Sequence, residues 1–321
     1  MRYVFQRLAQ LLIVFLLVTF GVLIVMRIGS GSANELGLRM LGGQASDTQV
    51  AEVISRYHLD SNYVVQYLYW LRDLVTGDLG YSQINNMDVT QLLTPLVMVT
   101  TLLGLYAIIF GVIIAVPVAV HQAYRRDGWF DRLASLSTFV IVGVPTIVLS
   151  VLLKLMFNTR LGWFPAIGDK IYPWQDLGGH FKNFFLPALT LTLPIAAIYA
   201  RLLRADMSLT LQADFITLAS AKGVPPRQVL WKHALRNSLF SIVTAIGTQL
   251  GALVGSAIVV ETFFDLDGLG GRLIRAVLTR DLFTVQSLVA VIVLLVVLVN
   301  FGVDLLYAVL DPRIRQVRAL G

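Results

Sequence analysis

The chain has few charged residues and no cysteine. Asp, Glu, Lys and Arg make up 14% of its 321 residues, whereas a soluble globular protein carries about 25%. Without cysteine it can form neither a disulfide framework nor a thiolate metal site. Apolar residues reach 57%, and they cannot all be hidden from water, because a protein of this size leaves much of its surface exposed. This composition excludes a soluble enzyme, a nucleic-acid-binding domain and a disordered chain, and it indicates that lipid surrounds much of the protein.

The sequence also lacks the common motifs of phosphate binding and catalysis. No Lys is followed by Ser or Thr, no His precedes Glu, and no Ser lies in a Gly-x-Ser-x-Gly pattern, so Walker, zinc-protease and esterase motifs are all missing. The histidines at 58, 121, 180 and 233 are scattered over different expected loops. We therefore expect that this chain binds no metal or other cofactor and catalyses no reaction. Energy for any transport would then come from another subunit.

Six segments are apolar over about the 20 residues that a helix needs to cross a bilayer. They are residues 8–26, 98–120, 133–157, 186–203, 239–260 and 285–310. Arg2 and Arg7 precede the first run, as in a signal peptide, but no small-residue cleavage site follows it, so we interpret it as an uncleaved span. The pattern predicts an all-α, polytopic membrane protein.

Lys and Arg predict the orientation of these spans. If both termini are cytoplasmic, the inside segments hold 14 basic residues in 68 positions and the outside segments hold 9 in 116. This bias follows the positive-inside rule, and it accounts for the net charge of +6 without nucleic acid as a partner. We expect an N-terminal transmembrane helix at 1–28, an external segment at 29–94 and a permease domain at 95–315 with an inside loop at 205–238.

The external segment is long enough to fold in part. Residues 47–59 and 64–75 have the apolar periodicity of helices. Gly77-Asp78-Leu79-Gly80 then indicates a turn.

Two features inside the expected spans bear on transport. Gly247, Gly251 and Gly255 recur every four residues and share one helical face, where small residues let another helix approach closely in lipid. This stripe indicates either simple helix packing or a gate. Asp304 lies within the sixth span, where it either hydrogen-bonds to a neighbouring helix or takes part in an ion relay. One acidic residue is less buried charge than an ion-coupled carrier usually needs.

The inside loop at 205–238 has the pattern of two short helices. The first would end at Lys222-Gly223, because glycine adopts the left-handed conformation that terminates many helices. The second would begin at Pro225-Pro226, since proline suits a first turn, and it would run to about Asn237. This amphipathic helix with Trp231 at its surface either lies on lipid or docks in a groove of a partner protein.

Several motifs, in order along the chain, resemble one family of transport proteins. Residues 214–223, followed by His233-Ala234-Leu235-Arg236-Asn237, resemble the cytoplasmic loop of binding-protein-dependent ABC importer permeases of the dipeptide/oligopeptide/nickel branch. Further matches to that branch are Gly77-Asp78-Leu79-Gly80 with Ser82, Leu186-Pro187-Ala188-Leu189-Thr190-Leu191, Glu261-Thr262-Phe263-Phe264, Gly268-Leu269-Gly270, Asp304-Leu305-Leu306-Tyr307 and Leu310-Asp311-Pro312-Arg313. One departure is Asp267, which replaces the usual proline before Gly268.

The resemblance implies the fold of a type I ABC importer permease. It implies a second homologous permease, two ATPase subunits that bind ATP and Mg, and an external peptide-binding protein. The residues that it implies for coupling to the ATPase are Asp214, Ala219, Ala221, Lys222, Gly223, Arg227, His233, Leu235, Arg236 and Asn237. Those that it implies for the external motif are Gly77, Asp78, Gly80, Glu261, Gly268 and Gly270. Gly247, Gly251, Gly255 and Asp304 are expected along the pathway or at the interface between the permeases.

The sequence thus predicts the permease subunit of an ATP-driven importer of di- or oligopeptides in the bacterial plasma (inner) membrane. Two alternatives stay open. In the first, the same machine imports a nickel chelate, haem or another small solute. In the second, the chain works alone as an ion-coupled secondary transporter, and it would then take up solute in vesicles under an ion gradient without any ATPase.

Overall fold

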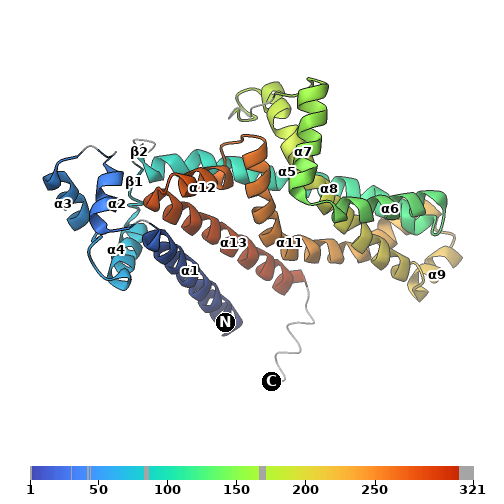
Figure 1. Cartoon of the computed structure of the whole chain (residues 1–321). Coiled ribbons are helices and arrows are strands. Elements are labelled where there is room, and N and C mark those ends of the chain that lie inside the picture. The colour runs from blue at the N-terminus through green and yellow to red at the C-terminus, as the bar shows by residue number, and fades with distance from the viewer. Residues whose placement is uncertain are drawn as a thin grey trace. The chain divides into compact units, whose positions relative to one another are not determined.

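The computed structural model is a helical protein with one short pair of strands (Figure 1). It describes residues 2–29, 31–41, 43, 45–82, 87–165 and 171–310, and the side chains among them except those of residues 2–5, 7 and 303–310. The chain forms two compact units. Of the described residues, unit 1 contains 2–99 and 267–301, and unit 2 contains 100–266 and 302–310.

Unit 1 contains the N-terminal helix and the predicted external segment. Its elements are α1 (Arg2–Ile28), α2 (Ala33–Met40), α3 (Asp47–Arg56), α4 (Tyr63–Thr76), β1 (Tyr81–Ser82), β2 (Met87–Asp88), the start of α5 (Val89–Tyr124), α12 (Leu269–Leu278) and most of α13 (Leu282–Leu310). Ser32 and Ser46 begin α2 and α3 with capping boxes, in which each hydroxyl accepts a backbone N–H three residues on. The helices predicted at 47–59 and 64–75 are confirmed as α3 and α4.

The core of unit 1 brings together segments that are far apart in the sequence. Its largest cluster joins the chain before α5, the first turns of α5, α12 and the start of α13. The buried members of this cluster are Leu79, Val89, Leu92, Leu93, Leu96, Leu269, Ala276, Val285 and Leu288. The 77–80 motif therefore lies beside helices that follow it by some 200 residues in the chain.

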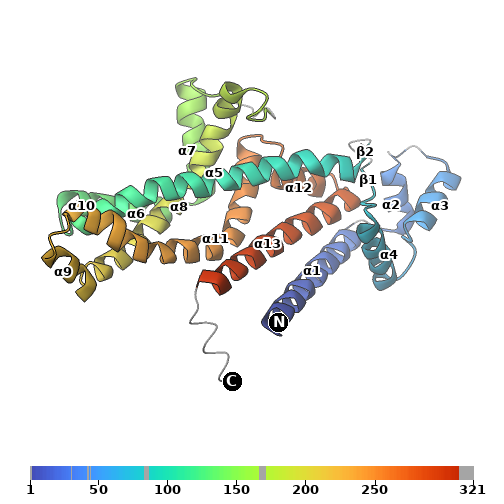
Figure 2. The ribbon, with the colours of Figure 1, turned by 180° about the vertical axis from the view of Figure 1, so that it is seen from behind.

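Unit 2 is built around the long helix α8 (Leu177–Thr210), which packs against α6 (Trp129–Gly143), α7 (Thr146–Leu153) and α11 (Leu235–Phe263). A π-helix, η1 (Lys154–Arg160), continues α7. Between α8 and α11 lie α9 (Asp214–Ala221), α10 (Pro226–Gln228) and a second π-helix, η2 (Val229–Ala234). Figures 1 and 2 both show α9 at the tip where α8 and α11 meet.

Five helical segments among the described residues are long and apolar enough to cross a membrane. They are Leu8–Ile28, Val89–Tyr124, Leu177–Thr210, Pro226–Phe263 and Leu282–Gly302. Each of the first, second, fourth, fifth and sixth predicted spans coincides with one of them for most of its length. These five predictions are confirmed as helices of membrane-spanning length.

The third predicted span, 133–157, is not one straight helix. Trp129–Gly143 and Thr146–Arg160 meet at an angle of 103°. Val144 is extended (φ −85°, ψ 121°), because the ring of the following proline disfavours helical conformation at this position. Pro145 in turn is the N-cap of α7. A proline within an apolar segment can bend a helix, but the sequence pattern does not give the size of the bend.

Candidate functional site

The segment that joins α8 to α11, residues 211–234, is here called the α8–α11 connection. Its tight turn is made by Gly223, which has a φ of +79°. The Gly223 N–H donates to the Ser220 carbonyl (3.0 Å) and the Val224 N–H donates to the Ala219 carbonyl (3.2 Å). These two bonds form a Schellman motif and satisfy carbonyls at the end of α9. The predicted left-handed end at Gly223 is confirmed.

The helix that follows this turn is longer than predicted. It begins at Pro226, as expected, but it continues through η2 into α11 and reaches Phe263 without a break. The expected end near Asn237 is therefore wrong. No glycine or proline occurs between Pro226 and Gly247, so nothing in the local sequence terminates the helix there.

The inner side of the connection packs on the ends of α5 and α8. Ile216 of α9, Val229, Leu230 and Ala234 of η2, and Leu235 of α11 are all buried. The residues beneath them are Ala119, Val120 and Ala123 of α5 and Leu203 and Met207 of α8. Burying one Leu-sized side chain stabilises a fold by about 1.5–3 kcal/mol, so several together hold the connection firmly on these helices.

The outer side of the connection is exposed and partly apolar. Phe215 is 44% exposed, Leu218 is 56% exposed and Trp231 is 45% exposed. Phe215 and Leu218 were not among the residues that the resemblance singled out for coupling. The sequence feature that could have identified them is their spacing of three residues, which places both side chains on one face of α9.

The residues that the resemblance implied for coupling divide between the two sides. Asp214, Ala221, Lys222, Gly223, Arg227, Arg236 and Asn237 are exposed. Ala219 and His233 are half-buried, and Leu235 lies in the buried cluster. The connection thus presents a mixed apolar and basic surface on a buried apolar base.

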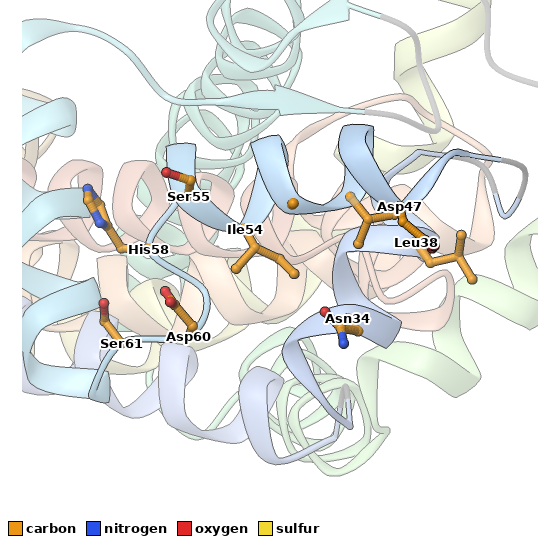
Figure 3. Close-up of a pocket in the computed structure, with 10 residues that line it drawn as sticks. Asn34, Leu38, Asp47, Ile54, Ser55, His58, Asp60 and Ser61 are labelled. Carbon is orange, nitrogen blue, oxygen red and sulfur yellow. The ribbon is translucent and has the colours of Figure 1, made fainter.

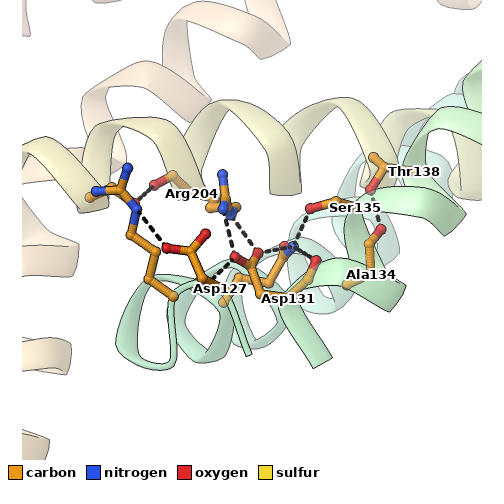
Figure 4. Close-up of polar contacts among 9 residues, drawn as sticks. Asp127, Asp131, Ala134, Ser135, Thr138 and Arg204 are labelled. Atoms are coloured by element: carbon orange, nitrogen blue, oxygen red, sulfur yellow. Dashed lines mark hydrogen bonds and ion pairs between the residues drawn. The ribbon is translucent and has the colours of Figure 1, made fainter. Parts of the chain in front are cut away.

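An ion pair between a buried carboxylate and a half-buried guanidinium lies beside this base (Figure 4). Asp131 of α6 is 2% exposed, and its two carboxylate oxygens accept from Nε and Nη2 of Arg204 of α8, each at 2.6 Å. Gln122 of α5 donates to the same carboxylate (3.0 Å), as does the backbone N–H of Asp127 (3.0 Å). The sequence pattern did not predict this cluster, because its members lie on three different helices and carry no fixed spacing.

The glycine stripe of α11 faces open space in unit 2. Gly251 and Gly255 are exposed, and a Cβ built on either would meet nothing within 4 Å. Gly247 is half-buried. This part of α11 is therefore free to approach another subunit or to line a pathway. The side chain of Asp304 lies outside the described residues, so its predicted role stays a prediction.

The external motif forms a tight turn in unit 1. Gly77 ends α4 with a φ of +86°, and the Asp78 side chain accepts the N–H of Gly80 (2.9 Å). Gly80 has a φ of +81°, and a Cβ on it would lie 3.1 Å from the ring of Phe283. The positive φ explains why glycine occupies both positions, and the nearby Phe283 ring leaves little room for a larger residue at position 80.

The residues around this turn tie it to the start of α13. Ser82 is fully buried and donates to Asp281 (2.7 Å), while Ser287 donates to the Leu79 carbonyl (3.0 Å). The rings of Tyr57 and Phe283 pack together with their centroids 4.3 Å apart. Burial raises the pKa of the Tyr57 phenol above its ordinary value.

The remaining residues of the predicted external motif lie in two places. In unit 2, Glu261 is fully buried near the end of α11, and its carboxylate accepts from Thr100 Oγ1 at 2.6 Å. In unit 1, Gly268 is the N-cap of α12 and Gly270 is buried in its first turn. Asp267, which replaces the usual proline, forms ion pairs with Arg272 (2.6 Å) and Arg275 (2.5 Å) of α12.

An open pocket of about 660 Å³ lies between α2, α3 and the turn that follows α3 (Figure 3). Asp47, His58 and Asp60 are among its lining residues, together with apolar side chains such as Leu38 and Ile54. The His58 ring stacks on Tyr69 with centroids 3.7 Å apart. Across the residues that the structure describes, no three His, Asp or Glu side chains converge as metal ligands.

Comparison with known proteins places this architecture in a family. Residues 107–316 match the family described as the inner membrane component of binding-protein-dependent transport systems. A dipeptide transport system permease protein of Alkalihalophilus pseudofirmus is 36% identical over 86% of this chain and 89% of its own length. A glutathione transport system permease protein of Pectobacterium atrosepticum is 34% identical over 86% of this chain and 88% of its own length. A protein of the same description from an Escherichia coli strain is 32% identical over 98% of this chain and 99% of its own length. The chain therefore belongs to the family of inner membrane components of binding-protein-dependent transport systems.

Proposed function

We propose that this chain is the permease subunit of an ATP-driven ABC importer that carries small peptides across the bacterial plasma membrane. Membership of the family supports the permease role. Similar proteins named for dipeptide and for glutathione transport support a peptide as the solute, because both solutes are short peptides. The basic inside segments support cytoplasmic termini.

The observation that carries this proposal is the α8–α11 connection. Its outer side exposes Phe215, Leu218 and Trp231 beside basic residues, while its inner side is buried on α5 and α8. An exposed apolar helix on a rigid base is the form of an element that docks in a groove of a partner protein. We assign that groove to an ATPase subunit, which moves the connection as a rigid body when it binds ATP.

The open glycine face of α11 supports a second permease as the other partner. In lipid, small residues allow close helix contact, and Gly251 and Gly255 have no contact on that side within the described part of this chain. A second permease would meet α11 there, and the solute pathway would run between the two chains.

The decisive experiment is uptake by the reconstituted complex. The chain is purified with a second permease and its ATPase subunits, placed in vesicles, and supplied with the binding protein and a radiolabelled dipeptide. We expect uptake that requires ATP, with no uptake when the ATPase carries a substitution that blocks hydrolysis.

The same vesicles separate the alternatives. Competition by unlabelled glutathione or by a nickel chelate identifies the solute. Uptake by this chain alone under an ion gradient would contradict the proposal and would establish a secondary transporter.

A further inference from the structure

Helix α6 packs along α8 with few fully buried side chains. Of its residues 129–143, only Asp131 and Thr138 are buried, and no apolar side chain of α6 is buried in unit 2. The Thr138 hydroxyl is hydrogen-bonded to the Ala134 carbonyl of its own helix. Phe130, Ala134 and Ile141 are half-buried, so Asp131 is the most deeply buried side chain of α6, and its carboxylate forms the ion pair that joins α6 to α8 (Figure 4).

The partners of Asp131 lie in the same segments that support the α8–α11 connection. Gln122 directly precedes Ala123 and lies two residues after Val120, and both of these belong to the buried cluster under the connection. Arg204 follows Leu203 directly, and Leu203 belongs to the same cluster. The ends of α5 and α8 thus hold the connection on one side and Asp131 on another.

An ion pair of this kind is directional as well as strong. The guanidinium of Arg204 meets both oxygens of Asp131, which fixes the angle between the two side chains as well as their distance. Apolar packing, by contrast, allows surfaces to slide over one another. Removal of Arg204 would leave the buried Asp131 carboxylate without its ion pair, and this is costly. Removal of the Asp131 charge would leave the partly exposed guanidinium of Arg204 without its bidentate partner.

We propose that Asp131 and Arg204 form a clamp through which α6 follows the movement of the α8–α11 connection. This inference rests on the proposed function and adds a positioning role to two residues outside the connection itself. Through α6 the movement would reach the bend at Pro145 and the helix α7 beyond it. Without the clamp, α5, α8 and the connection would still move with the ATPase, but α6 would no longer follow them.

The test uses Asp131→Asn, which removes the charge of the carboxylate and keeps the size of the side chain. Asp127→Asn is the matched control, because the Asp127 side chain is exposed and forms a long ion pair with Arg126 (3.9 Å). Its backbone N–H, which donates to Asp131, is unchanged by the substitution, and asparagine tolerates its positive φ. Arg204→Lys is the second variant. It keeps the ion pair but loses the two-pronged geometry.

The first measurement is the number of solute molecules taken up per ATP hydrolysed by the reconstituted importer. We expect Asp131→Asn to lower this ratio about fivefold or more, the size of a typical allosteric coupling. Arg204→Lys should give an intermediate value, and Asp127→Asn should match the wild type. A role in folding alone would lower the yield of assembled complex and leave the ratio unchanged.

The second measurement follows α6 directly. The chain has no cysteine, so Leu133→Cys on α6 and Leu209→Cys on α8 allow two spin labels to be attached to this chain at these two positions alone. Both positions are exposed. We expect the distance between the labels to be the same with and without bound ATP in the wild type, and to split into two populations in Asp131→Asn.

The results separate the clamp from the proposed function. If Asp131→Asn keeps the wild-type ratio and a single label distance, the clamp is wrong. If both asparagine variants lower the ratio equally, the effect is not specific to Asp131 and the clamp is again wrong. If the wild-type complex shows no ATP-dependent uptake, the proposed function fails, while the label distances still decide whether α6 and α8 move together.

Discussion

Ser82 and Asp281 are separated by 199 residues in the sequence, yet the Ser82 hydroxyl donates a 2.7 Å hydrogen bond to the Asp281 carboxylate. The same carboxylate accepts the Thr284 hydroxyl at 2.7 Å. Asp281 precedes α13, so it also lies where the helix dipole favours a negative charge. One buried serine thereby connects the external turn to the first turn of α13.

Ser82→Ala should destabilise unit 1 through the loss of this bond. We expect about 1.5 kcal/mol, because hydrogen bonds to charged groups are stronger than neutral ones. Thermal unfolding of the purified protein in detergent would measure it. Ser137→Ala is the control, since the exposed Ser137 hydroxyl donates to the Leu133 carbonyl of its own helix. Equal losses in the two variants would contradict a special role for Ser82.

Gly80→Ala should cost more stability than Gly77→Ala. Both residues have a positive φ, which strains an L-residue by about 1–2 kcal/mol. A Cβ at Gly80 would also press on the Phe283 ring at 3.1 Å, whereas one at Gly77 would meet nothing within 4 Å. Unfolding midpoints of the two variants measure the difference. The steric argument fails if their order is reversed.

Gly223→Val should uncouple ATP hydrolysis from uptake while the protein still inserts in the membrane. The left-handed turn would be strained by about 1–2 kcal/mol, and no clash adds to this, because a Cβ there meets nothing within 4 Å. Gly223→Asn is the control, since asparagine adopts this conformation more readily. Uptake and hydrolysis are measured on the same vesicles. Normal uptake by the valine variant would count against a coupling role.

Gly251→Leu and Gly255→Leu should leave the stability of the isolated chain unchanged, since both face open space. Gly111→Leu should lower it, because a Cβ at Gly111 would lie 2.8 Å from Ile195. In the assembled importer, loss of the second permease on size-exclusion chromatography would place the stripe at the interface. Normal assembly without uptake would place it on the pathway, and normal assembly with normal uptake would exclude both roles.

Local chemistry was enough to predict most of the helices and the turns between them. The left-handed end at Gly223 and the start of a helix at Pro226 followed from the residues themselves, because glycine and proline act through their own backbone. The end of that helix was predicted near Asn237 but lies at Phe263. The amphipathic pattern stops near Asn237, but a change in side-chain polarity does not break the hydrogen bonds between backbone groups.

The sequence by itself determined the membrane setting, five helices of spanning length and the order of the motifs, because hydropathy and glycine conformation are properties of short stretches. Only the tertiary structure decided the 103° bend at Pro145, the pairing of Ser82 with Asp281 and the meeting of Asp131 with Arg204. Contacts of this kind join residues that lie far apart in the sequence. They depend on how the elements pack against one another, and no spacing along the chain encodes that.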